Sequence, residues 1–229
     1  MYNKPQKLVA EFVGTFALIF FGAGSICADQ FLRTAGQGGL GLLGIALAHG
    51  LAIGIMVTSL GHISGGHFNP AVTIGFWVTR KLSTIDTLAF WAAQLAGASV
   101  AAYLLRLLPV DVWTAVRLGT PDLASGVSPA NGMIFEGIMT FFLVFVVFAT
   151  AVDPRGAFNK IAGFAIGLTI TMGALFGGPF TGAALNPARA FGPALAANHW
   201  TNHGVYWIGP LAGGVAAGWL YDIFFLKKE

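Results

Sequence analysis

Charged side chains are scarce in this chain. Only 9% of its 229 residues are Asp, Glu, Lys or Arg, whereas 56% are hydrophobic, and the mean hydropathy is +0.75. A soluble globular domain carries about 25% charged residues, so this composition excludes an ordinary soluble protein. It predicts a chain that folds in a lipid bilayer.

Several functional signatures are missing as well. The single cysteine, Cys27, excludes an internal disulfide. The sequence shows no nucleophile with a neighbouring base, no phosphate-binding loop and no cluster of metal ligands, so it favours neither an enzyme nor a cofactor or metal site. No basic run with interleaved aromatic residues suggests nucleic acid as a partner.

Six long windows contain no charged side chain. Once its flanks are counted, each is near or above the roughly 20 residues that a helix needs to cross about 30 Å of hydrocarbon. The sequence therefore predicts an all-α membrane protein with six transmembrane helices. The windows are 12–28, 34–61, 87–105, 137–152, 161–188 and 204–221.

The loop cations orient these helices. An even number of spans places both termini on one side, and that side holds most of the Lys and Arg residues. Because cytoplasmic loops carry the positive excess, we expect cytoplasmic termini and, as the location, the plasma (cell inner) membrane. The cations on this side are Lys4, Lys7, Arg80, Lys81, Arg155, Lys160, Lys227 and Lys228.

The two halves of the chain repeat each other. "EFVGTFALIF" from Glu11 and "EGIMTFFLVF" from Glu136 share five residues in register, and each segment precedes an Asn-Pro-Ala. Each half holds three spans, so the second half must enter the membrane from the opposite side, which produces an inverted repeat. We expect one domain over 1–229, with repeats of about 1–106 and 130–229 and an extracellular linker of about 107–129.

Each Asn-Pro-Ala reads as a helix start, because Asn is a preferred N-cap and Pro suits the first helical position. Helices over 69–80 and 186–197 would rise about 16 Å, half of the hydrocarbon thickness. We therefore expect two re-entrant half-helices whose positive dipole ends meet near the midplane. The two positive dipole ends repel cations and protons, while the Asn amides donate hydrogen bonds to small neutral solutes. The residues are Asn69, Pro70, Ala71, Asn186, Pro187 and Ala188.

These motifs resemble those of the aquaporins, in the major intrinsic protein family. "SGGHFNPAVT", "NPARAFGPAL" and the paired Glu-x-x-x-Thr-Phe segments carry the resemblance, which covers nearly the whole chain. It implies a six-helix bundle with two half-helices, one pore per subunit and a homotetramer in the lipid bilayer.

Arg189 is unusual on physical grounds alone, because a charge within the membrane is costly and is functional by default. The resemblance places a four-residue selectivity filter on His49, Ala174, Ala183 and Arg189. In strict water channels the four filter positions resemble Phe, His, a small residue and Arg, in that order. This chain has His49 at the first position and Ala174 at the second, so we expect a wider filter. Plant tonoplast-type aquaporins are more similar, with His first and a small or aliphatic residue second.

The expected function is a passive water channel that excludes protons and ions. Ala190 and the pair Tyr206-Trp207 differ from the residues that glycerol facilitators carry, and so favour water. The alternatives are a broader channel for neutral solutes (ammonia, urea, hydrogen peroxide or glycerol) and a secondary transporter, since inverted repeats serve both classes.

Two further groups of polar residues flank the motifs. We expect Glu11 and Glu136 to accept hydrogen bonds from the non-helical backbone before each half-helix, which has no other partner in a dry environment. We interpret "GHISGGH" as the lining of the cytoplasmic vestibule, because two glycines and no third ligand type argue against a metal. Its residues are His62, Gly65, Gly66 and His67.

Overall fold

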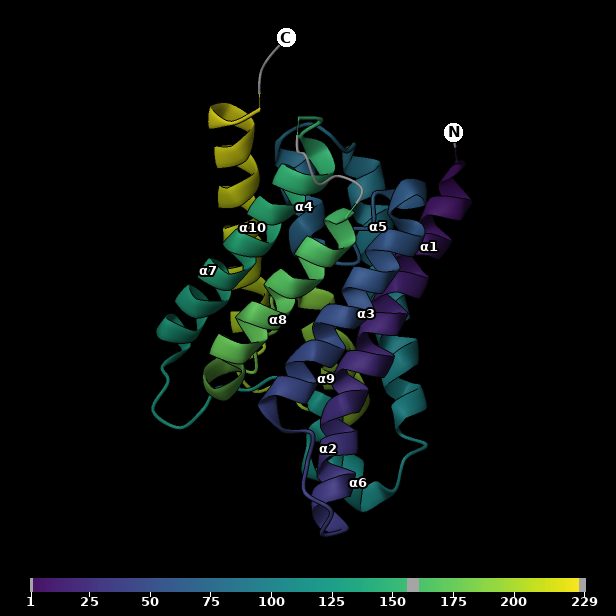
Figure 1. Ribbon diagram of the computed structural model, residues 1–229, viewed down its shortest axis with the longest axis vertical. Helices are drawn as coiled ribbons and strands as arrows, with labels where there is room; N and C mark the ends of the chain where they lie inside the picture. The colour runs from purple at the N-terminus through teal and green to yellow at the C-terminus, as the bar shows by residue number, and fades with distance from the viewer. Residues whose placement is uncertain (1, 156–160, 227–229) are drawn as a thin grey trace.

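The structure is a computed structural model that describes residues 2–155 and 161–226. Long helices form a single elongated bundle, and α1 begins at the same end of the bundle at which α10 ends (Figure 1). This arrangement matches an even number of spans and confirms the predicted all-α fold.

The first half of the chain opens with one continuous helix of 31 residues that passes through a π-helical segment. Asn3 caps it, and its side chain accepts from the backbone N–H of Gln6. The elements of this half are α1 (Lys4–Ala17), η1 (Leu18–Ala23), α2 (Gly24–Thr34), α3 (Gly41–Ser64), α4 (Pro70–Val78) and α5 (Thr84–Leu105).

The second half repeats this order of long and short helices after a short connection. A second π-helical segment ends its first long helix, as η1 interrupts the first long helix of the chain. The connection contains α6 (Val110–Ala115) and η2 (Arg117–Gly119), and the second half contains α7 (Pro129–Val147), η3 (Phe148–Val152), α8 (Ala162–Thr181), α9 (Pro187–Ala197) and α10 (Val205–Phe224).

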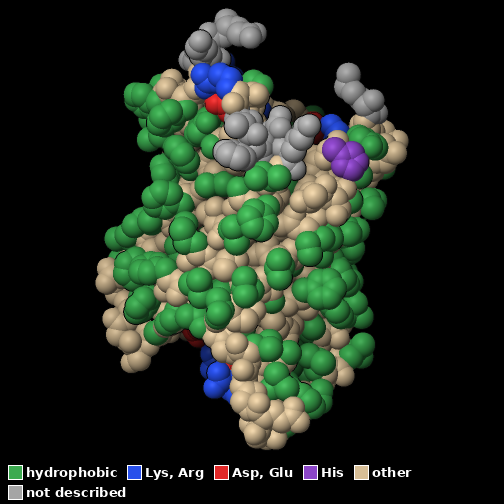
Figure 2. All heavy atoms as spheres, in the orientation of Figure 1, with side chains coloured by type: hydrophobic (Ala, Val, Ile, Leu, Met, Phe, Trp, Pro, Cys, Tyr) green, Lys and Arg blue, Asp and Glu red, His purple; other side chains and the backbone are tan. Residues whose placement is uncertain are grey.

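Five of these helical stretches are long and apolar enough to cross a membrane: Lys4–Thr34, Gly41–Ser64, Thr84–Leu105, Pro129–Val152 and Ala162–Thr181. The sixth predicted span, α10, has 20 residues and packs against α7, but it includes Asp222 and falls outside that group. Hydrophobic side chains cover the middle of the face in Figure 2, and Lys and Arg side chains lie near its two ends. This distribution suits a bilayer around the middle of the bundle.

The predicted window 161–188 was wrong at its end. Helix α8 stops at Thr181, because Gly182 adopts a left-handed conformation (φ 79°) and the chain then leaves the helix until Pro187. The apolar residues after Gly182 therefore belong to the loop and the half-helix that follow. Hydropathy alone does not separate these three pieces.

The half-helices α4 and α9 begin at Pro70 and Pro187, immediately after their Asn caps, as predicted. They have 9 and 11 residues, so each rises about 14–16 Å, half of a membrane. Helix α4 lies toward the end of the bundle where the chain termini are, and α9 lies toward the other end (Figure 1).

Glycines bring the helix backbones close together. A Cβ at Gly50 in α3 would lie 2.5 Å from the carbonyl oxygen of Gly167 in α8, and a Cβ at Gly192 in α9 would lie 2.5 Å from the carbonyl oxygen of Ala98 in α5. Small residues of this kind allow close helix packing inside a membrane. Such contacts account for glycines in the middle of these membrane helices.

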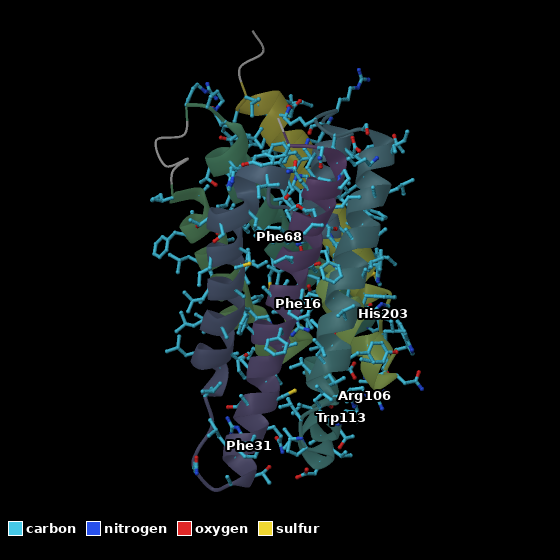
Figure 3. All side chains as sticks on the ribbon, turned by 90° about the vertical axis from the view of Figure 1, so that its right-hand side faces the viewer. Phe16, Phe31, Phe68, Arg106, Trp113 and His203 are labelled. Atoms are coloured by element: carbon cyan, nitrogen blue, oxygen red, sulfur yellow. The ribbon has the colours of Figure 1, made fainter. Side chains whose placement is uncertain are left out.

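The predicted linker 107–129 contains two short helical pieces, α6 and η2. The guanidinium of Arg106 lies 5.1 Å from the ring centroid of Trp113, where a cation–π contact holds α6 against the end of α5 (Figure 3). The linker is therefore an ordered cover at the end of the bundle opposite the termini.

Candidate functional site

Two asparagines cap the half-helices in the same way. The Oδ1 of Asn69 accepts from the backbone N–H of Ala71 at 2.8 Å, and the Oδ1 of Asn186 accepts from Ala188 at 2.9 Å and from Arg189 at 3.2 Å. Each cap satisfies N–H groups that the first turn of a helix leaves free. The carboxamide orientation is therefore fixed, with its NH₂ group directed away from its own helix.

The two NH₂ groups cross-link the half-helices. Nδ2 of Asn69 donates to the carbonyl oxygen of Leu185 at 2.9 Å, and Nδ2 of Asn186 donates to the carbonyl oxygen of Phe68 at 2.9 Å. Each acceptor residue directly precedes the other asparagine in the chain. A carboxamide carries two N–H donors, so one N–H of each asparagine remains for another acceptor.

Two buried carboxylates hold the segments before the half-helices. Glu11 accepts from the backbone N–H groups of His67 at 3.0 Å and Phe68 at 2.7 Å. Glu136 accepts from those of Ala184 at 3.0 Å and Leu185 at 2.8 Å. These contacts provide partners for backbone groups that would otherwise be buried without one.

A hydroxyl completes each of these supports. The Oγ of Ser64 donates to Glu11 at 2.7 Å and accepts from the N–H of Gly66 at 3.1 Å. Thr181 makes the same two contacts in the second half, donating to Glu136 at 2.6 Å and accepting from Ala183 at 3.1 Å. The two loops are therefore built by one scheme despite different sequences.

Both loops place non-glycine residues in the left-handed region. Phe68 has a φ of 48° and Leu185 a φ of 51°, directly before the two asparagines. Such residues cost about 1–3 kcal/mol each and persist only where their surroundings fix them. Here the carbonyl oxygens of both residues are the acceptors of the asparagine cross-links.

A cavity of about 180 Å³ runs through this region. It is lined by both asparagines and by all four predicted filter residues, together with aliphatic side chains from η1, α2, α3 and α8. The structure thus brings His49, Ala174, Ala183 and Arg189 to the same cavity as Asn69 and Asn186. Its polar groups are few and its walls are mostly apolar, as in small-molecule sites.

His49 and Arg189 are hydrogen-bonded to each other. Nδ1 of His49 lies 2.9 Å from the carbonyl oxygen of Ile45, so this nitrogen must carry the proton. Nε2 then has a lone pair, and it accepts from Nη2 of Arg189 at 3.1 Å. The geometry therefore assigns a neutral His49, because a second ring proton would point at the guanidinium.

Arg189 is fixed at a second point and keeps a free donor. Its Nη1 donates to the carbonyl oxygen of Gly119 at 2.8 Å, so the linker reaches the buried guanidinium. Its buried Nε–H has no partner among the described residues. Ala174 and Ala183 add only methyl groups to this part of the cavity, so they leave it open.

The four residues predicted for the vestibule separate in the structure. His67 is buried, lines the cavity and places Nδ1 3.2 Å from Oγ1 of Thr73. His62 is exposed, and its ring packs edge-on against Tyr2 with 5.6 Å between the centroids. Gly65 and Gly66 provide the turn between them, with φ values of 96° and 64°.

A polar cluster covers the end of the bundle near Gly119. Asp122 accepts from Arg117 at 3.1 Å, from His199 at 2.9 Å and from Asn202 at 3.3 Å. Partial burial acts to raise the pKa of Asp122, but the hydrogen bonds from His199, from its neighbouring backbone N–H and from Asn202 outweigh this effect and lower the pKa. The cluster joins the linker to the segment after α9.

The sequence analysis missed Gln94 and Gly119. Gln94 lies in mid-span, where its Nε2 donates to Glu11 at 2.7 Å and to Thr73 at 3.0 Å. A buried amide in an apolar window was a signal for such a role. Gly119 acts through its carbonyl oxygen, which no side-chain pattern reveals.

Comparisons with known proteins agree with this geometry. The family model described as "Major intrinsic protein" matches residues 2–221. The chain is 44% identical over 228 residues to "Aquaporin TIP4-4" of Zea mays (97% of this chain, 88% of the relative). It is 44% identical over 233 residues to "Probable aquaporin TIP3-2" of Arabidopsis thaliana (99% of this chain, 86% of the relative).

A solved structure shows the same architecture. The X-ray structure of the aquaglyceroporin from Plasmodium falciparum superposes with a TM-score of 0.85 at 25% sequence identity, and covers 97% of each chain. The match covers nearly the whole chain and, with the family model over residues 2–221, supports an integral membrane protein. The chain therefore belongs to the major intrinsic protein family.

Proposed function

We propose that this chain is a passive transmembrane channel for water that excludes protons and ions. The observation that carries the proposal is the pair of asparagine amides, each with one N–H left over at the meeting point of two helix N-termini. The family assignment and the relatives named aquaporins support a channel rather than an enzyme.

The asparagines act on the orientation of a passing water molecule. Both present donors only, so a water between them accepts with its oxygen and turns its own hydrogens away from the motifs. The oxygen of such a water has no lone pair left to accept a proton from a neighbouring water, so a proton cannot be passed along the file of waters at this point. The positive dipole ends of α4 and α9, each equivalent to roughly half an elementary charge, further repel cations at this point.

The proposed filter lies beside Arg189. The guanidinium donates to solute oxygens and repels cations, and the neutral His49 opposite it is held as an acceptor for Nη2. Ala174 and Ala183 line the same cavity without large side chains. These two alanines favour the second candidate function, a broader channel for ammonia, urea, hydrogen peroxide or glycerol. Nothing in the cavity favours the secondary transporter.

The rest of the proposal concerns assembly and location. One domain over 1–229 contains repeats of about 1–106 and 130–229, and the matching supports at Glu11 and Glu136 favour this division. We infer a homotetramer from the family resemblance, with exposed aromatic and aliphatic side chains in contact with lipid or neighbouring subunits. Cytoplasmic termini and a plasma membrane location rest on the loop cations, and the relatives' TIP names lend the plasma membrane no support.

The test compares water and proton flux in proteoliposomes that hold a pH-sensitive dye. We expect osmotic water flux well above that of protein-free liposomes, with proton flux equal to theirs. Asn69→Asp keeps an N-cap but replaces the free donor with an anionic acceptor, so it should admit protons or cations. Asn3→Asp, at the exposed cap of α1, is the matched control. A wild-type channel that passes protons, or an Asn69→Asp variant that matches the control, would refute the mechanism.

A further inference from the structure

Gly22 in the first membrane helix lies directly behind His49. A Cβ built on Gly22 would lie 2.7 Å from Cδ2, 3.0 Å from Cγ and 3.1 Å from Nε2 of the imidazole. Real Cβ atoms essentially never approach closer than 3.0 Å, so no larger residue fits here unless the ring moves. The backbone of Gly22 is therefore the surface against which the imidazole rests.

The helix around Gly22 forms part of the cavity wall. Leu18 and Ile26, four residues before and after it, both line the cavity. Gly22 lies within η1, and π-helical segments of this kind occur frequently at functional sites. An imidazole pushed away from this wall moves into the lumen or toward Arg189.

The other contacts of His49 leave the ring little freedom. Its Nδ1–H is held by the Ile45 carbonyl oxygen and its Nε2 by Arg189. With an alanine at position 22, the imidazole of His49 would have to move by about 0.7 Å, so that its Cδ2 lies at an ordinary contact distance of 3.4 Å from the new Cβ. That shift disturbs the 3.1 Å bond to Arg189 and narrows the aperture at the same time.

We propose that Gly22 is a further positioning residue of this channel, whose missing side chain holds His49 against the wall and sets the width at Arg189. The inference rests on the proposed function, since it concerns the filter of the same pore. It adds a position on the first membrane helix to the four filter positions expected from the family resemblance.

The test is a double-mutant cycle read out as osmotic water permeability per reconstituted protein. Gly22→Ala should lower the permeability severalfold. Gly24→Ala, in the same helix, places its Cβ 3.3 Å from a flexible Leu105 methyl group and should leave it within about 1.5-fold of wild type. In a His49→Ala background there is no ring to displace, so Gly22→Ala should change the permeability by less than about 1.5-fold.

Two outcomes overturn the inference. One is a Gly22→Ala variant that conducts like Gly24→Ala. The other is a Gly22→Ala effect of equal size with and without His49, since a general packing defect does not depend on the ring. A wild-type protein that conducts no more water than protein-free liposomes overturns the proposed function itself, so the two failures are distinguishable.

Discussion

Replacing Glu136 by glutamine tests the support under the second half-helix. The side chain keeps its shape, but one carboxylate oxygen becomes an NH₂ group and the charge is lost. Glu136 is fully buried and accepts from Thr181 and Ala184 on Oε1 and from Leu185 on Oε2. Glutamine has one acceptor oxygen, so at least one buried donor faces an NH₂ group.

The expected cost follows from these contacts. Leaving the Leu185 N–H without a partner costs about 1–3 kcal/mol, and each remaining bond loses about 1 kcal/mol on passing from a charged to a neutral acceptor. Glu136→Gln should therefore destabilise the protein by about 3–5 kcal/mol. The carbonyl oxygen of Leu185 also accepts from Asn69, so the disturbance reaches the pore and should lower water permeability.

Thermal unfolding in detergent, followed by circular dichroism, measures the effect. At about 2–4 °C per kcal/mol for a chain of this size, the midpoint should fall by about 6–20 °C. Asp86→Asn is the matched control, because its exposed ion pair with Lys4 is worth at most about 1 kcal/mol. If Glu136→Gln unfolds within about 2 °C of this control, the account of the loop support is wrong.

Three further predictions concern the filter, the polar cluster around Asp122 and Tyr206. Arg189→Val should raise proton flux in dye-loaded proteoliposomes, because among the described residues Arg189 carries the only formal charge that lines the cavity, and an unchanged flux would count against the guanidinium as a barrier. The pKa of Asp122 is lower in the folded protein than the usual carboxyl value of about 4, so its hydrogen bonds stabilise the fold at pH values above that usual value. This stabilisation is lost as the pH falls through the pKa of Asp122 in the folded state. Asp122→Asn should therefore weaken the acid dependence of the unfolding midpoint, and an identical dependence would refute this. Tyr206→Phe removes a 2.8 Å bond to the Thr181 carbonyl oxygen and should cost about 1 kcal/mol in the same unfolding assay, so no change would contradict that bond's role.

Much of the fold could be predicted because a bilayer imposes strong rules. Uncharged windows had to be helices, and Asn-Pro marked the starts of α4 and α9 to the residue. Helix ends were harder to predict. The first helix runs over Lys4–Thr34, well beyond the window 12–28, because its polar ends are still helical. Hydropathy reports where lipid is, whereas helix length depends on capping and on contacts beyond the bilayer.

In the functional site, too, some residues could be predicted from the sequence, whereas their contacts could not. Residue type and position selected Glu11 and Arg189, since charged groups in apolar sequence are costly, whereas His49 was selected through the family resemblance. Their partners could not be selected in this way. The bond between His49 and Arg189 joins residues far apart in the sequence, and the contributions of Gly22 and Gly119 come from a missing side chain and a backbone oxygen.

The central claim is that this chain forms a passive pore for water. Stopped-flow light scattering on proteoliposomes tests it directly, with osmotic gradients of an impermeant solute, urea or glycerol. We predict water permeability far above that of protein-free liposomes, with a low activation energy, no saturation and slow glycerol entry. Water permeability equal to that of protein-free liposomes would contradict the claim.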